Sequence, residues 1–163
     1  MSKNLFILKF VFNDNNEITV TINKTISTDI INTDYYTDID EVLVNGKSAK
    51  TYNYISLLDE GTNVLTIRFI SPLDSCRSMF SGLINILFID LSNFISKNVT
   101  DTTSMFSDCI SLKSINLNGF DTSSLLYMNH MFAGCTSLLT LDLSNLNTSK
   151  VRAWEKFFLI AIR

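Results

Sequence analysis

The residues best suited to chemistry in this 163-residue chain are its three cysteines and its only histidine. A cysteine nucleophile needs a histidine beside its thiolate, and a structural zinc ion needs four ligands. Cys109 and Cys135 are 26 residues apart, whereas Cys76 and His130 do not share their spacing. Because this set favours neither arrangement, we expect no enzymatic activity, no metal and no cofactor.

A second set of polar side chains shares the 26-residue spacing: Asp90, Asn116 and Asp142. Their oxygens are of the kind that hard cations prefer, but Ca²⁺ takes six to eight such ligands. Three oxygen-bearing side chains in a straight row are too few and too linear for that shell. We therefore interpret this set as polar surface.

The 26-residue spacing is a property of the whole second half of the chain. "MFSGLINILFIDLSNFISKN" begins at Met79, "MFSDCISLKSINLNGFDTSS" at Met105 and "MFAGCTSLLTLDLSNLNTSK" at Met131. Phe157-Phe158 stands where a fourth pair is due. A period of 26 falls within the range of about 20–29 residues that is typical of leucine-rich repeats.

Each copy carries apolar residues in the pattern apolar-x-x-apolar-x-apolar-x-x-apolar. These positions are Ile86/Ile89/Leu91/Phe94, Leu112/Ile115/Leu117/Phe120 and Leu138/Leu141/Leu143/Leu146. Their alternation predicts a short strand in each copy, with one buried face. Stacking such strands at about 4.8 Å would build a parallel sheet with continuous apolar columns.

The segment that begins each copy is expected to form a short helix or 3₁₀ turn. Met128, Met131/Phe132 and Cys135 recur at the helical spacing i, i+3/i+4, i+7. Gly82 and Gly134 then occupy a left-handed cap position, which Asp108 fills in the middle copy. Cys109 and Cys135 would lie one rung apart, either bridged or, as we favour, as small buried core residues.

These patterns predict an α/β fold: a short leucine-rich-repeat solenoid of about three and a half coils with a parallel sheet. The array would span residues 71–163, with an incomplete last repeat. His130 matches Ser78, Ser104 and Lys156 in the other copies, which indicates a surface position.

Residues 1–70 contain no copy of the repeat and are predicted to form a small β-rich N-terminal cap. "LFILKFVF", "NDNN" and "EITVTIN" read as a hairpin, and "NVLTIRFI" as a further strand. Asn45-Gly46 is suited to a tight turn. "STDIINTDYYTDIDEV" is expected to form a capped helix that starts after Ser27 or Thr28. The first coil of a repeat array exposes an unpaired edge, so such a cap is required.

Composition excludes several classes of protein. An apolar fraction of 46% with 18% charged residues indicates a folded core. The net charge is −3 and no basic cluster is present, so we expect no binding to nucleic acid. No apolar run reaches about 18 residues, and Lys9 interrupts the N-terminal one, so we expect no membrane insertion and no clear signal peptide.

The aligned copies resemble the repeats of BspA-like leucine-rich-repeat surface proteins, found in bacteria and some protists. That repeat reads "MFxGCxSLxxLDLSNFDTSxVTxM", and "MFAGCTSLLTLDLSNLNTSKV" matches it almost throughout. The resemblance covers about residues 71–156. In the first copy Leu83 replaces Cys, and "VRAWEKFFLIAIR" keeps the aromatic pair but loses the Gly-Cys.

The resemblance implies a cell-surface or extracellular protein that binds host molecules, matrix or other cells. It implies neither catalysis nor a cofactor, and it supplies no fixed set of binding residues. The strand positions that face outward form the candidate binding face, which we expect to take a protein or glycan partner. The face comprises Phe88, Asp90, Ser92, Ser114, Asn116, Asn118, Thr140, Asp142 and Ser144.

Two alternatives remain open at the level of sequence. The polar strand positions also fit a merely solvated sheet face. The alternative for the chain as a whole is a structural piece or truncated repeat fragment without a specific ligand. Such a piece would self-associate edge to edge near Leu143 and Leu146, where the fourth copy loses its strand.

Overall fold

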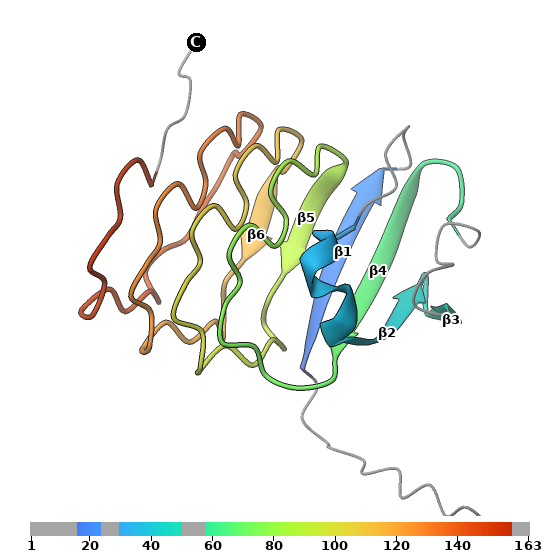
Figure 1. The fold of residues 1–163 in the computed structure, drawn as a ribbon. Coiled ribbons are helices and arrows are strands. Elements are labelled where there is room, and N and C mark those ends of the chain that lie inside the picture. The colour runs from blue at the N-terminus through green and yellow to red at the C-terminus, as the bar shows by residue number, and fades with distance from the viewer. Residues whose placement is uncertain (1–15, 24–29, 50–57, 158–163) are drawn as a thin grey trace, which may run out of the picture.

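The computed structural model describes residues 16–23, 30–49 and 58–157. Their strands form one six-stranded mixed sheet in the order β3-β2-β4-β1-β5-β6 (Figure 1). The strands are β1 Glu17–Asn23, β2 Ile39–Val44, β3 Lys47–Ala49, β4 Thr62–Phe69, β5 Ile86–Asp90 and β6 Ser114–Asn116. The described residues contain one helix, the 3₁₀ helix η1 at Thr33–Asp38.

The predicted parallel-sheet solenoid of α/β class is wrong. Four of the five strand pairings are antiparallel, and only β5 and β6 pair in parallel. The third copy contributes no strand, because Thr140–Asp142 lacks regular structure. Strands from the N-terminal region therefore outnumber those of the repeats, and all of them join one sheet.

Of the short helix or 3₁₀ turn expected at the start of each copy, the described residues form the turn and not a helix: the Met105 N–H donates to the Thr102 carbonyl three residues earlier at 3.1 Å. The N–H groups of Ser78 and Phe80 donate to the carbonyls of Thr103 and Met105 in the next copy, at 2.9 Å each. Donors used between copies are not free for the bonds that a helix makes within itself. Ser78 also lies at φ 55°, outside the right-handed helical region.

The N-terminal strands follow the predicted alternation. Ile18, Val20 and Ile22 are buried on one face of β1, which pairs with β4 along its whole length. Asn45 and Gly46, at φ 50° and 79°, make the predicted tight turn between β2 and β3. The other half of the predicted first hairpin, "LFILKFVF", lies outside the described residues.

The predicted capped helix is shorter and begins later than expected. Asn32 is the N-cap of η1 and accepts a hydrogen bond from the Asp34 N–H at 3.1 Å. Ile39 already begins β2, because the alternation that follows it favours a strand. Ser27 and Thr28 lie outside the described residues. The Tyr35 hydroxyl donates to the Arg77 carbonyl at 2.8 Å, so η1 packs against the first repeat.

The repeats lie side by side, and two columns of phenylalanine rings run through them. Phe80, Phe106 and Phe132 stack with centroids 5.8 and 5.3 Å apart. Phe94 and Phe120 stack at 6.3 Å in the second column. Aromatic rings at such spacing contribute beyond their buried area. The inward aliphatic positions of β5 and β6 are buried as well.

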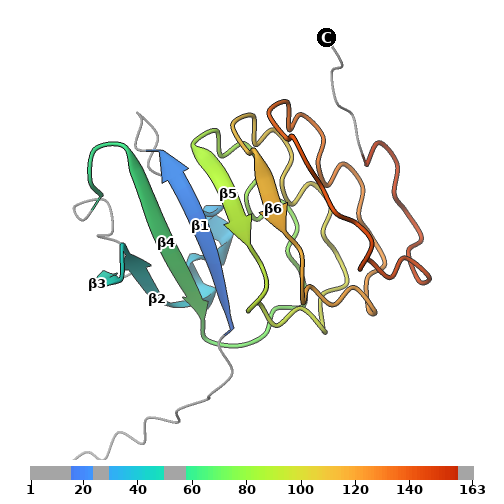
Figure 2. The same cartoon turned by 180° about the vertical axis from the view of Figure 1, so that it is seen from behind.

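The sheet runs without a break from the N-terminal strands into the repeats. β1 pairs with β5, with Val20 opposite Ile89, and so covers the edge of the first repeat. Figure 1 shows η1 on one side of the sheet, and Figure 2 looks onto the opposite side, the outer face, where the sheet lies in front.

Candidate functional site

The nine residues of the candidate binding face belong to three consecutive copies. β5 and β6 position Phe88, Asp90, Ser114 and Asn116 on the outer face, where all four are partly exposed. The other five residues are exposed: Ser92, Asn118, Thr140, Asp142 and Ser144. All nine side chains are therefore accessible to solvent, which is the property that a recognition surface requires.

The middle row of this face also has a structural role that the sequence analysis missed. One carboxylate oxygen of Asp90, Oδ1, accepts hydrogen bonds from the Ser92 N–H at 2.9 Å and from the Asn116 Nδ2 at 3.0 Å. Asp142 accepts from the Ser144 N–H at 2.9 Å. The bonds from the Ser92 and Ser144 N–H groups are Asx turns at the ends of the strand positions, and the Asn116 bond joins the first two copies. The signal was in the sequence, as Asp or Asn two residues before Ser or Asn.

Hydrogen bonding shapes the electrostatics of this row. The Ser144 hydroxyl and N–H lower the pKa of the exposed Asp142, because both stabilise its charged form. At neutral pH the row therefore displays a negative charge at its open end. Within the described ranges, no three His, Cys, Asp or Glu side chains converge to hold a metal ion.

The outer face of the N-terminal strands is different, because its arginine is paired with two carboxylates. Arg68 on β4 contacts Glu17 on β1 at 3.1 Å and Glu41 on β2 at 2.6 Å. Hydrogen bonding to Glu17 raises the pKa of Arg68. This part of the sheet thus presents internally paired charges, whereas the candidate binding face presents polar groups, the partly exposed Asp90 carboxylate and the exposed Asp142 carboxylate.

The three cysteines are free and buried. The thiols of Cys109 and Cys135 each lie 3.0 Å from a phenylalanine carbonyl of the preceding copy, those of Phe80 and Phe106. Burial raises the pKa of Cys109, and raises that of Cys135 to about 11. A reactive cysteine needs a lowered pKa instead. These thiols therefore serve as hydrogen-bond donors between copies.

His130 holds a backbone position that recurs in every copy. Ser78, Ser104, His130 and Lys156 all have φ between 50° and 57°. The His130 N–H donates to the Glu155 carbonyl of the fourth copy at 3.1 Å. The position is thus defined by a left-handed turn, which tolerates several residue types only at a cost in strain.

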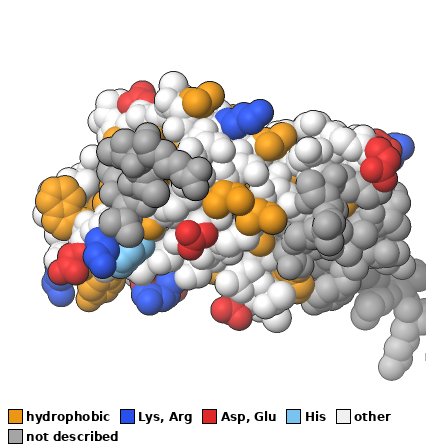
Figure 3. Space-filling model, turned by 90° about the horizontal axis from the view of Figure 1, so that it is seen from above, with side chains coloured by type: hydrophobic (Ala, Val, Ile, Leu, Met, Phe, Trp, Pro, Cys, Tyr) orange, Lys and Arg blue, Asp and Glu red, His pale blue; other side chains and the backbone are white. Residues whose placement is uncertain are grey.

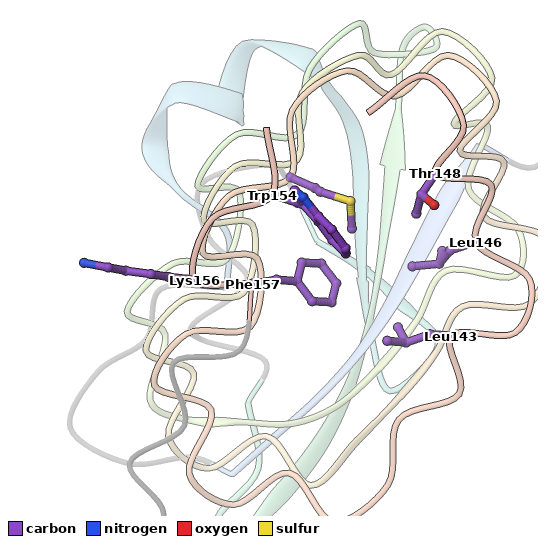
Figure 4. Close-up of a pocket in the computed structure, with 7 residues that line it drawn as sticks. Leu143, Leu146, Thr148, Trp154, Lys156 and Phe157 are labelled. Carbon is purple, nitrogen blue, oxygen red and sulfur yellow. The ribbon is translucent and has the colours of Figure 1, made fainter. Parts of the chain in front are cut away.

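A groove of about 630 Å³ lies at the C-terminal end of the repeats, and of its lining the sequence analysis assigned only Leu143 and Leu146 to an open edge. Figure 4 shows the side chains of Leu143, Leu146 and Thr148 facing those of Trp154 and Phe157, while Lys156 extends away. The signal in the sequence was the fourth copy itself, which keeps its aromatic pair but loses the Gly-Cys. The groove is lined by Met128, Leu143, Leu146, Thr148, Trp154, Lys156 and Phe157.

Other exposed apolar side chains are dispersed. Ile84 and Ile110 occupy the same position in consecutive copies and are about half exposed. Figure 3 shows hydrophobic side chains in separate places on the face seen from above, with charged and polar groups between them. The described part of this face therefore offers no continuous apolar patch comparable with the groove.

No helix among the described segments has the length and apolar character needed to cross a bilayer.

Comparison with known sequences places the repeats in a family. The sequence pattern of the family described as "Mycoplasma protein of unknown function, DUF285" matches residues 73–162, slightly more than half of the chain. The chain belongs to the DUF285 family. No curated protein and no solved structure matches it. The region matched by DUF285 contains β5, β6, the candidate binding face and the groove.

Proposed function

We propose that this DUF285 chain is a non-enzymatic recognition module of the BspA-like surface-protein type. It would act at the cell surface or outside the cell and bind a protein or glycan partner through the outer face of its repeats. The observation that carries the proposal is the accessibility of all nine face residues, drawn from three consecutive copies, of which the first two pair in register through β5 and β6. Repeat proteins commonly bind partners on extended surfaces of this kind.

The chemistry of the face suits a polar partner. Its accessible groups are hydroxyls, amides and the carboxylates of Asp90 and Asp142, with the Phe88 ring partly exposed beside them. Hydroxyls and amides both donate and accept hydrogen bonds, as protein backbones and sugars do. An aromatic ring adds an apolar contact of defined shape. The buried, protonated thiols support a role without covalent chemistry.

The test is a binding screen against immobilised matrix proteins and a glycan array. Ser114→Lys and Asp142→Lys place a cation on the face. Asn98→Lys is the matched control, because Asn98 is exposed in the connection between the first and second copies. We expect binding to be lost at least tenfold in the two face variants and retained in the control. Partners that bind all three variants equally would exclude this face as the binding surface.

A further inference from the structure

The chain contains two Asn-Gly dipeptides, Asn45-Gly46 and Asn118-Gly119. Both asparagines are exposed, and each lies in a tight turn. An asparagine before glycine can lose its amide group by spontaneous reaction, because glycine has no side chain to hinder attack by its backbone nitrogen on the asparagine amide carbon. The asparagine side chain must turn toward that nitrogen, so the rate depends on what holds the side chain in place.

The Asn45 side chain is held by three hydrogen bonds. Its Nδ2 donates to Asp59 Oδ2 at 3.1 Å and to Asn63 Oδ1 at 3.0 Å, and its Oδ1 accepts from the Val64 N–H at 2.9 Å. Asn63 is fully buried and fixed by two further bonds to the Asp59 backbone, at 2.8 Å each. The Asn45 amide reaches the Gly46 nitrogen only when its three bonds break, so this dipeptide is protected.

The Asn118 side chain is held far less firmly. Its Oδ1 accepts one hydrogen bond, from the Nδ2 of the exposed Asn145 at 3.1 Å. In the described part of the chain, the Asn118 Nδ2, which is the atom that would leave as ammonia, donates to no other group. A single bond between two exposed side chains contributes little, because water replaces it readily.

The backbone around Asn118 also permits the movement. The Phe120 N–H donates to the Leu117 carbonyl at 3.1 Å, and φ is 81° at Gly119 but negative at Asn118, which defines a type II turn. Among the described residues, neither the Asn118 carbonyl nor the Gly119 N–H forms a hydrogen bond. The peptide group between them can therefore rotate, as it does between type II and type I turns, without breaking the bond that closes the turn.

Packing between the copies requires the glycine of this dipeptide. A methyl group at Gly119 would lie 2.9 Å from the Ser92 carbonyl oxygen of the preceding copy. The first and third copies have Ser-Asn at the corresponding positions, so the second copy alone carries Asn-Gly.

We propose that Asn118 is a site of self-modification, at which the folded chain deamidates through attack by the Gly119 backbone nitrogen. This nitrogen bonds to Asn118 Cγ and gives its proton to water, while Nδ2 takes a proton from water and departs as ammonia. The product is a cyclic succinimide, which water then opens at one of its two carbonyl carbons. Opening at Cγ leaves aspartate, and opening at the main-chain carbonyl leaves isoaspartate. The reaction consumes one water and needs no oxidant or reductant.

The two products change the second copy differently. Aspartate keeps the main chain and adds a carboxylate to the middle copy of the candidate binding face. Isoaspartate adds a backbone carbon between Leu117 and Phe120, which are 4% and 3% exposed, and so disturbs the stacking of Phe120 on Phe94. The reaction needs no partner, so the proposal is independent of the recognition role proposed above.

The test compares the two dipeptides within one protein. The 163-residue chain is incubated at mildly alkaline pH, and tandem mass spectrometry of its proteolytic peptides measures the replacement of amide by carboxylate at Asn45 and Asn118. We expect deamidation at Asn118 to be at least about tenfold faster, because two additional hydrogen bonds hold the Asn45 side chain. In urea above the unfolding midpoint these bonds are absent, and the two rates should become comparable.

Asn118→Ser is the matched variant, because Ser92 and Ser144 hold the same position and their N–H groups make the same turn. This variant should lose the fast deamidation and keep the urea midpoint. Equal rates at Asn45 and Asn118 in the folded chain, or a faster reaction at Asn45, would overturn the proposal. It would also be overturned if both sites react in urea but neither reacts in the folded chain, or if the fast reaction persists in Asn118→Ser.

Discussion

The second and third repeats carry nearly the same letters but not the same environment. Leu117 and Phe120 of the second copy are buried, whereas their equivalents Leu143 and Leu146 remain partly exposed. The second copy has a copy on each side, whereas among the described residues the fourth copy covers only the turn side of the third. Burial in this molecule is therefore set by what lies on the adjacent rung, not by the repeat sequence itself.

The first repeat shows how such an edge is covered when a neighbour is supplied. β1 comes from outside the repeats and pairs antiparallel with β5, and Ile86 and Ile89 are then fully buried. A strand without the repeat sequence therefore suffices to cover a repeat edge. Among the described residues, the strand-side edge of the third copy has no such strand beside it.

The largest expected effect separates the two repeats by stability. Leu117→Ala should lower the free energy of unfolding by about 2–5 kcal/mol, because it opens a cavity between two covered rungs. Leu143→Ala should cost about 1 kcal/mol, since its side chain is already partly in water. Urea denaturation of both variants measures the difference. Equal costs would mean that the third rung is covered in the free chain and would remove the basis of the comparison.

Two glycines provide the next comparison, because both lie at φ 73°. A methyl group at Gly82 meets no atom within 4 Å, so Gly82→Ala should cost only the backbone strain of about 1–2 kcal/mol. At Gly134 the same group collides with the Asp108 carboxylate of the preceding copy, which should add about 1–3 kcal/mol.

The clash at Gly134 can be tested by removing its partner. Asp108→Gly in the Gly134→Ala background takes away the carboxylate and should recover most of the added cost in thermal denaturation. If this second change recovers nothing, the contact between the copies is not the source of the loss. Gly82→Ala with Asp108→Gly serves as the control, since Gly82 has no such contact.

Much of the local structure could be predicted from the sequence, because it depends on short-range pattern. The buried faces of β1 and β4, the Asn45-Gly46 turn and the left-handed positions at Gly82, Asp108 and Gly134 follow the prediction. Sheet topology did not, because it depends on how strands from distant parts of the chain meet. The pairing of β1 with β5 joins the predicted cap to the repeats and makes the sheet mixed.

The expected helix failed for a related reason. Its spacing was read from Met128, Met131 and Cys135, and all three are buried as a helical face would be. A stacked turn buries the same positions, and its donors go to the next copy, where the Phe106 N–H meets the Met131 carbonyl at 3.0 Å. Periodicity alone does not distinguish these two arrangements.

A smaller effect follows from the thiols that connect the copies. Burial raises the pKa of Cys135 from 9.0 to about 11, so the folded chain keeps this proton where the unfolded chain loses it. The free energy of unfolding should therefore fall as the pH rises from about 9 through about 11. Cys135→Ala should reduce that slope in urea unfolding between pH 8 and 11. An unchanged slope of the free energy of unfolding against pH would show that the Cys135 thiol does not contribute to this pH dependence.

The smallest expected effect on stability concerns Asp142, at the open end of the outer face. Asn116 forms the same turn through its amide oxygen, accepting from the Asn118 N–H at 3.0 Å, so Asp142→Asn should leave the urea midpoint unchanged at pH 7. Hydrogen bonds from Ser144 lower the pKa of Asp142. The stability that the charged carboxylate adds to the folded chain is therefore complete above the ordinary pKa of 3.8, and it is lost as the pH falls through the lowered pKa. In Asp142→Asn, the urea midpoint should therefore fall slightly less steeply with decreasing pH in the acid range. If this variant keeps its stability but loses a partner, the charge itself takes part in recognition; a loss of stability at pH 7 would instead show that the turn needs the carboxylate.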